Sequence, residues 1–197
     1  FGPALDRPAV WAFWWPRFER IARWFIEQER KRRGELAASF TECRGEMELS
    51  GPAGPFLLTA TADRIDVLRD GRLVILDYKT GQPPKPNDVA LGFSPQLPLE
   101  AAIAASGGFP GVPTGAIAEL AYWRLSGGDP AGEISAMRAD AAALAAEAKA
   151  GLERLIAAFD DPATPYESRP RADSAPRFSD YEHLARVREW SAIGDAP

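Results

Sequence analysis

The clearest pattern of hydrophobic and polar positions lies near the start of the chain. Between Pro16 and Gly34 the apolar residues recur every three or four positions, and arginine and glutamate fill most of the positions between them. The apolar set is Phe18, Ile21, Ala22, Phe25 and Ile26. This spacing predicts an amphipathic helix that ends near Arg33. We expect the tryptophans on and before this helix to pack against the core, namely Trp11, Trp14, Trp15 and Trp24.

Strands are predicted in the middle of the chain. Residues 46–49 alternate polar and apolar side chains, and residues 50–55 have the Gly and Pro content of a loop. Residues 56–68 and 72–78 are then predicted to form a hairpin whose turn contains Asp70-Gly71.

The second half of the chain mixes helices with one more strand. Ser94-Pro95 supplies an N-cap and a first-turn proline for a helix over 96–105. A last strand is predicted over 116–125, a long alanine-rich helix over 139–159 and a short helical tail over 181–190. This order of elements predicts an α/β fold, in which helices flank a central mixed β-sheet.

Asp77 and Lys79 are the most informative residues of the predicted hairpin. They end an apolar strand, and side chains at positions i and i+2 of a strand share a face. Two further aspartates, Asp63 and Asp66, lie on the other strand of the hairpin. Carboxylates that hold a divalent metal, beside a lysine, are the groups that a metal-dependent phosphodiesterase needs. We choose Asp63 and Asp77 as metal ligands with the carbonyl of Tyr78 as a third, and Lys79 as the group that orients or helps deprotonate the attacking water.

The geometry of the turn decides which aspartate faces Asp77. A two-residue type I′ turn would put Asp66 on the face of Asp77. A type I turn centred on Arg69-Asp70, with Gly71 in a left-handed bulge position, would put Asp63 opposite Asp77 instead. The residues of the hairpin alone leave both registers open.

Scarce cysteine and histidine limit the metal chemistry of this chain. Cys43 is the single cysteine and His183 the single histidine, so the chain alone can build neither a four-cysteine site nor a multi-histidine centre. Oxygen ligands remain, which favours magnesium or manganese. We assign His183 no role. The net charge of −5 argues against bulk electrostatic coating of nucleic acid, but a nuclease with a local basic groove remains compatible with it.

Other classes of protein are disfavoured by missing signals. No apolar run is long enough to span a membrane and the start lacks the layout of a signal peptide, so we expect a cytoplasmic protein without a membrane partner. No glycine-rich phosphate-binding loop is present, so ATP use is not expected in this chain. Because residue 1 is not a methionine, we expect an excised C-terminal domain of a longer polypeptide.

Four stretches of the chain combine into one larger motif. They are Thr61-Ala62-Asp63-Arg64-Ile65-Asp66, Asp70-Gly71, Asp77-Tyr78-Lys79-Thr80-Gly81, and Gln96 at the start of the next helix. Together they resemble the RecB-type branch of the PD-(D/E)XK nuclease superfamily. The similarity is closest to the C-terminal nuclease domains of the AddB family, and residues 96–100 and 180–191 extend it over most of the chain.

The resemblance implies a restriction-endonuclease-like core with magnesium- or manganese-dependent DNA exonuclease activity. Such a domain would act on DNA unwound during recombinational double-strand break repair, beside an AddA-like helicase–nuclease subunit. Carried over by position, Asp63 and Asp77 are metal ligands, Lys79 is catalytic, and Gln96 positions the substrate. The same pattern favours the bulged hairpin register.

Two charged neighbours of these residues are expected to have supporting roles. The register leaves Asp66 a secondary role behind the metal ligands or as a partner of arginine. Arg64 is a candidate phosphate contact in substrate binding, and an ion pair is the simpler role for it.

The chain also departs from the family pattern. Relatives carry a metal-binding histidine on an early helix, which we expect upstream of Phe1, and a tyrosine where this chain has Glu100. The iron–sulfur cluster of some relatives cannot form with one cysteine. The alternative function is therefore a catalytically incomplete DNA-binding or scaffold module that docks a helicase subunit.

The resemblance also suggests a division of the chain into three parts. We expect an N-terminal helical segment at 1–40, the nuclease core at 41–165, and a C-terminal tail with a short helix at 166–197.

Overall fold

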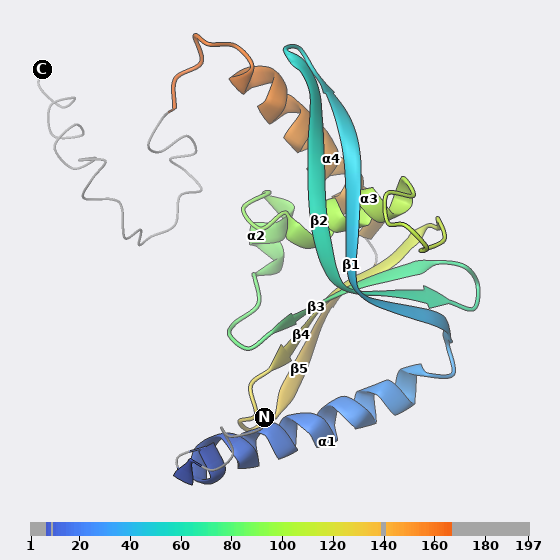
Figure 1. Ribbon diagram of the computed structural model, residues 1–197, viewed down its shortest axis with the longest axis vertical. Coiled ribbons are helices and arrows are strands. Elements are labelled where there is room, and N and C mark those ends of the chain that lie inside the picture. The colour runs from blue at the N-terminus through green and yellow to red at the C-terminus, as the bar shows by residue number, and fades with distance from the viewer. Residues whose placement is uncertain (1–6, 9, 139–140, 167–197) are drawn as a thin grey trace, which may run out of the picture. The chain divides into compact units, whose positions relative to one another are not determined.

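The computed structural model of the protein describes residues 7–8, 10–138 and 141–166 (Figure 1). The chain divides into two units, 1–157 and 158–197. The described part of the second unit is short, and in it Phe159 stacks on Tyr166 with ring centroids 4.8 Å apart. The tail helix predicted over 181–190 lies outside the described residues. In the part of the chain that is described, no helix is long and apolar enough to cross a membrane.

A five-stranded mixed sheet forms the centre of the first unit (Figure 1). The strands lie in chain order, from β1 to β5. Neighbouring strands are antiparallel except β3 and β4, which are parallel. Their bounds are β1 (Leu36–Gly51), β2 (Gly54–Leu68), β3 (Leu73–Lys79), β4 (Ile117–Leu125) and β5 (Gly132–Met137). The expected α/β fold with a mixed sheet flanked by helices is thus confirmed.

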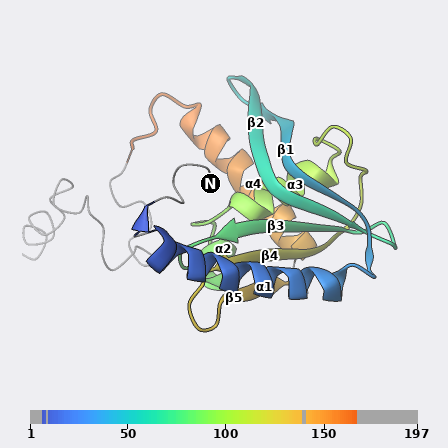
Figure 2. The same cartoon turned by 60° about the horizontal axis from the view of Figure 1, so that its bottom comes forward.

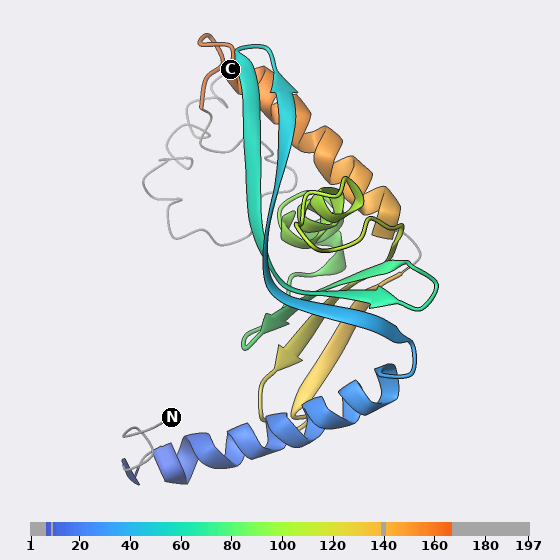
Figure 3. The ribbon, with the colours of Figure 1, turned by 45° about the vertical axis from the view of Figure 1, so that its right-hand side comes forward.

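Helices lie on both faces of this sheet. On one face runs α1 (Trp15–Arg32), preceded by the π-helical turn η2 (Val10–Trp14) (Figure 2). The chain between the parallel strands β3 and β4 carries α2 (Pro86–Ala90) and α3 (Gln96–Ala105), and α3 packs against the opposite face (Figure 3). After β5 comes α4 (Ala141–Phe159).

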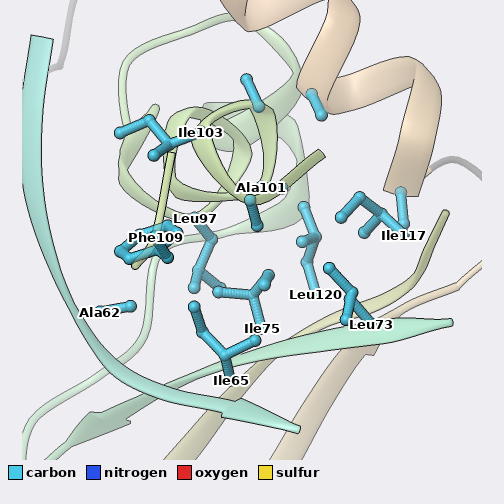
Figure 4. Packing of buried hydrophobic residues seen from close by; sticks show 14 of the residues in the cluster. Ala62, Ile65, Leu73, Ile75, Leu97, Ala101, Ile103, Phe109, Ile117 and Leu120 are labelled. Atoms are coloured by element: carbon cyan, nitrogen blue, oxygen red, sulfur yellow. The ribbon is translucent and has the colours of Figure 1, made fainter. Parts of the chain in front are cut away.

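The two faces of the sheet bury separate apolar clusters. On the face of α3, Ile65, Ile75, Leu97 and Leu120 are fully buried (Figure 4). On the face of α1, the largest buried side chain is that of Trp123 on β4, and its neighbours include Trp24, Phe25 and Tyr78. Because strand residues alternate between faces, β3 and β4 contribute to both clusters.

The predicted elements were confirmed where the periodicity was regular. The helix over 96–105 has the expected bounds, and the first helix covers 15–32. The alternation at 46–49 belongs to a much longer strand, because β1 begins at Leu36. The loop expected over 50–55 shrinks to a turn of two residues, Pro52 and Ala53.

Three expectations were wrong. The strand over 116–125 is not the last, because β5 follows it and pairs with its outer edge. The side chain of Ser94 does not cap α3, whose N-cap is Pro95 without a side-chain hydrogen bond. Trp11 and Trp14 do not pack in the core, since they are 52% and 66% exposed. Both lie in η2, before α1 begins, whereas Trp24, at the middle of α1, packs against the buried cluster.

Candidate active site

The hairpin of β2 and β3 adopts the bulged register. Gly71 has φ +83°, its N–H donates to the carbonyl of Leu68 at 2.9 Å, and the N–H of Leu68 donates to the carbonyl of Arg72 at 2.8 Å. Ile65 pairs with Ile75 in the ladder. Continued by two residues along each strand, this register puts Asp63 beside Asp77. Of the two alternatives that the sequence left open, the structure selects the second.

Asp63 is fixed to the strand that carries the other acidic residue. Its Oδ2 accepts a hydrogen bond from the backbone N–H of Tyr78 at 2.8 Å. Tyr78 lies between Asp77 and Lys79, so this bond ties the carboxylate of β2 to the centre of the Asp77-Tyr78-Lys79 segment. The result is a pair of carboxylates from neighbouring strands, held by backbone geometry.

Asp77 is the most buried carboxylate of the group. Asp77 is 1% exposed. The Nζ of Lys79 donates a hydrogen bond to Oδ1 of Asp77 at 3.0 Å. The same Nζ forms an ion pair with Oδ2 at 2.8 Å, without the alignment of a hydrogen bond. Gln96 Nε2 donates to Oδ1 at 2.7 Å. Burial raises the pKa of Asp77, and the charge of Asp63 raises it further, although Lys79 and Gln96 act in the opposite direction. A group of this kind favours a bound cation, which would stabilise its charged form.

Gln96 connects the strand to the first turn of α3. Its Oε1 accepts from Lys79 at 3.3 Å, and its Nε2 donates both to Asp77 and, at 3.2 Å, to Oε1 of Glu100. Positions four apart on a helix lie on the same face, which explains why Gln96 and Glu100 meet. Glu100 is 3% exposed, and burial raises its pKa to about 7. The structure therefore brings Gln96 to the acidic pair, and its expected part in positioning the substrate stays a prediction.

Tyr122 is a member of this group that sequence reasoning missed. It lies on β4 directly beside Asp77 in the parallel ladder, and Lys79 Nζ is 6.0 Å from the centre of its ring. Its hydroxyl is buried and has no hydrogen-bond partner among the residues that the structure describes. Burial raises the pKa of that hydroxyl, and the charges of Asp77 and Glu100 add to the shift. The sequence indicates only that Tyr122 belongs to the predicted strand over 116–125. Its place beside Asp77 depends on the pairing of two strands that are far apart in the sequence.

Arg64 and Asp66 lie on the other face of the sheet, under α1. The guanidinium of Arg64 donates to Glu29 at 2.6 and 3.1 Å, to Asp66 at 2.7 Å and to the Tyr78 hydroxyl at 3.3 Å. Arg32 also donates to Asp66 at 3.1 Å, and Ser39 hydrogen-bonds to it as well. Arg64 is 5% exposed and Asp66 is fully buried. The structure does not bring Arg64 to the acidic pair as a phosphate contact; ion pairing occupies it.

The donor set suits a hard divalent cation. Carboxylate oxygens of Asp63 and Asp77 and the backbone carbonyl of Tyr78 are the ligands that magnesium and manganese prefer. In the described part of the chain, no three groups from His, Cys, Asp and Glu are arranged closely enough to hold a metal ion. The match to such a cation therefore rests on the chemistry of two carboxylates and one backbone carbonyl. His183 lies outside the described residues.

The chain is similar to one family of known proteins over most of its length. Residues 5–174 match the family model of the PD-(D/E)XK nuclease superfamily. Uncharacterized proteins of Rickettsia bellii (strain RML369-C) and Rickettsia felis (strain ATCC VR-1525 / URRWXCal2) are each 31% identical over 96 residues, which are 49% of this chain. Those residues are 12% and 11% of the two relatives, so the chain spans only a small part of their length. A solved structure titled "Crystal structure of SSO0001" is 14% identical with a TM-score of 0.35, over 65% of this chain and 56% of that one.

Proposed function

Because this chain belongs to the PD-(D/E)XK nuclease superfamily, we propose that it is a metal-dependent DNA exonuclease domain. The observation that carries the proposal is the fixed pair of Asp63 and Asp77, with the ammonium of Lys79 on the second carboxylate. Nuclease activity follows from the family in general terms. The choice of magnesium or manganese, of DNA and of digestion from an end is the proposal.

Each residue of the site has a definite part in the proposed hydrolysis. Asp63, Asp77 and the carbonyl of Tyr78 would hold the cation, which when bound neutralises phosphoryl charge and activates water. Lys79 is positioned by Asp77 and Gln96 to orient the attacking water and to offset negative charge near the scissile phosphate. Gln96 holds both Lys79 and Asp77, so it fixes their relative position and would help to place the substrate.

The wider biological setting is also part of the proposal. We propose a RecB-type domain similar to those of the AddB family, working in the cytoplasm on DNA unwound during double-strand break repair beside an AddA-like subunit. The combined motif from Asp63 to Gln96 supports it. The division at 1–40, 41–165 and 166–197 belongs to the same proposal, with 41–165 holding the catalytic residues.

The test is degradation of single-stranded DNA by the protein that carries this chain, with magnesium or manganese. Asp77→Asn and Lys79→Ala should each lower the rate by at least about a hundredfold, since each removes a charge that acts on the transition state. Asp70→Asn is the matched control, because Asp70 lies in the exposed turn of the same hairpin and pairs with Arg72, away from the acidic pair. Full activity of Asp77→Asn would refute the proposed function.

A second candidate is a DNA-binding or scaffold module without catalysis. The lack of a set of three metal-binding groups among the described residues favours it. It predicts that the protein binds single-stranded DNA equally well with EDTA and with manganese, and that calorimetry detects no manganese binding. Manganese binding that Asp77→Asn abolishes would reject this second candidate.

A further inference from the structure

A group of aromatic side chains reaches the surface where η2 joins α1. Trp11, Phe13 and Trp14 are 52%, 71% and 66% exposed. The ring of Trp15 lies between two others, with its centroid 5.1 Å from that of Trp11 and 5.6 Å from that of Phe18. We call these five residues the aromatic platform. Large apolar side chains gathered on a surface mark a place where another molecule binds.

The segment that carries the aromatic platform is basic. Residues 7–33 include eight arginines and lysines but only three glutamates, although the whole chain has a net charge of −5. Several arginines beside the rings are exposed, namely Arg7, Arg17, Arg20 and Arg23. The guanidinium of Arg17 lies 5.8 Å from the centre of the Trp14 ring. Positive charge among exposed aromatic rings suits single-stranded nucleic acid, because bases stack on the rings while phosphates attract the guanidinium groups.

The aromatic platform lies at the end of the sheet where the catalytic lysine is found. The strands β3 and β4 are parallel, so their carboxyl ends meet at one edge, and there Lys79 pairs with Arg124. Just beyond β4, the carbonyl of Ser126 accepts a hydrogen bond from Arg17 at 2.8 Å. This bond attaches the start of α1 to the edge at which β3 ends (Figure 2). A strand of DNA bound to the platform would therefore lie close to the acidic pair.

We propose that the aromatic platform binds single-stranded DNA by base stacking and directs one end of the strand to Asp63 and Asp77. The direction of the strand rests on the proposed function, because it assumes that this pair cleaves DNA. The stacking does not, since it requires neither metal nor cleavage. Stacking also tolerates every base, which a nuclease that degrades any sequence requires.

The first experiment measures the affinity of the protein that carries this chain for a fluorescent oligothymidylate of about 16 nucleotides, by anisotropy in EDTA. Trp11→Ala and Trp14→Ala should each weaken binding by at least about fivefold, the effect of losing one stacked base. Trp14→Phe keeps an aromatic ring and should stay within about twofold of the wild type. Phe56→Ala is the matched control, because Phe56 is also exposed, at 41%, but lies near the tip of the β1–β2 hairpin.

A second experiment reports on the platform itself. An oligonucleotide that carries 5-iodouracil couples on irradiation to aromatic side chains in contact with the base, and mass spectrometry locates the crosslink. We expect it on Trp11, Phe13 or Trp14. This measurement distinguishes the platform from any other DNA-binding region of the protein.

The outcomes separate this inference from the proposed function. Weaker binding by both alanine variants, together with a crosslink on the platform, supports the inference. It is overturned if no crosslink forms there, or if the double variant Trp11→Ala/Trp14→Ala binds DNA within twofold of the wild type. Unchanged DNA binding with loss of a protein partner would assign the platform to protein docking and also overturn it. None of these results changes the nuclease proposal, which depends on cleavage by Asp77→Asn.

Discussion

The buried ion-pair network under α1 should make Arg64 far more important for stability than an exposed arginine of the same hairpin. Arg64 carries hydrogen bonds to Glu29, Asp66 and Tyr78 and is 5% exposed. Arg64→Met keeps much of the length of the side chain and removes all its donors. The exposed arginine is Arg72, which pairs with Asp70 at 2.7 Å through side chains that are 54% and 51% exposed.

The expected cost follows from the partners that each substitution leaves behind. Removing one member of a buried ion pair costs about 3–5 kcal/mol, because the other charge stays buried. Asp66 keeps Arg32 and Ser39, and Glu29 can reach solvent, so the cost should lie near the low end, about 3 kcal/mol. That is more than a hundredfold in the unfolding equilibrium, since each 1.4 kcal/mol or so is tenfold. Exposed pairs contribute at most about 1 kcal/mol, and Arg72→Met is the control.

Urea denaturation followed by tryptophan fluorescence measures both variants. With a slope of about 2 kcal/mol per molar urea, the midpoint of Arg64→Met should fall by about 1.5 M. The midpoint of the Arg72 control should move by less than about 0.5 M. If the two variants shift the midpoint equally, the buried network does not stabilise the fold and the reasoning is refuted.

Three further predictions concern other parts of the first unit. The fold raises the pKa of Glu100 from 4.5 to about 7, so the folded state binds this proton more tightly than the unfolded state does. With EDTA present, the free energy of unfolding should therefore fall by about 3 kcal/mol as the pH rises from 4.5 to about 7. The variant Glu100→Gln should flatten this decline. Gly108→Ala should destabilise the protein by about 2 kcal/mol in urea, because a Cβ there would lie 2.1 Å from the backbone oxygen of Glu46; a neutral effect would mean that the backbone yields. Trp24→Ala should cost about 2 kcal/mol by thermal unfolding, whereas Trp14→Ala, at a side chain 66% exposed, should stay within about 0.5 kcal/mol; equal losses would contradict the observed packing.

Elements with regular periodicity could be predicted from the sequence alone. The helix Gln96–Ala105 has the predicted bounds, and the hairpin strands are close to theirs. β5 (Gly132–Met137) was missed because its exposure does not alternate cleanly and its stability comes from pairing with β4. Periodicity also shows which side of a helix is apolar without showing what covers it, which is why Trp11 was wrongly assigned to the core.

The candidate site shows the same boundary between local and non-local information. Asp77 and Lys79 share a face because of strand geometry, which the sequence contains. The placement of Asp63 needed the turn, and the residues of the turn did not decide between two registers. In the sequence Glu100 stood out only as a departure from the family pattern, and Tyr122 was not identified. The burial of Glu100 and the pairing of Tyr122 with Asp77 depend on contacts between β3, β4 and α3.

The bulged turn at Gly71 places an unusual restriction on how this protein can vary. The turn lies five residues from Asp63 along β2, which is roughly 17 Å of strand, and it contacts none of the acidic residues of the site. Yet one residue more or less between Leu68 and Arg72 would shift the ladder by one position and turn Asp63 to the face of α1. Apart from Gly71, whose φ of +83° favours glycine, the side chains of the turn are free to change, while an insertion or deletion there would dismantle the acidic pair from a distance. In this hairpin the number of residues matters more to the site than their chemistry.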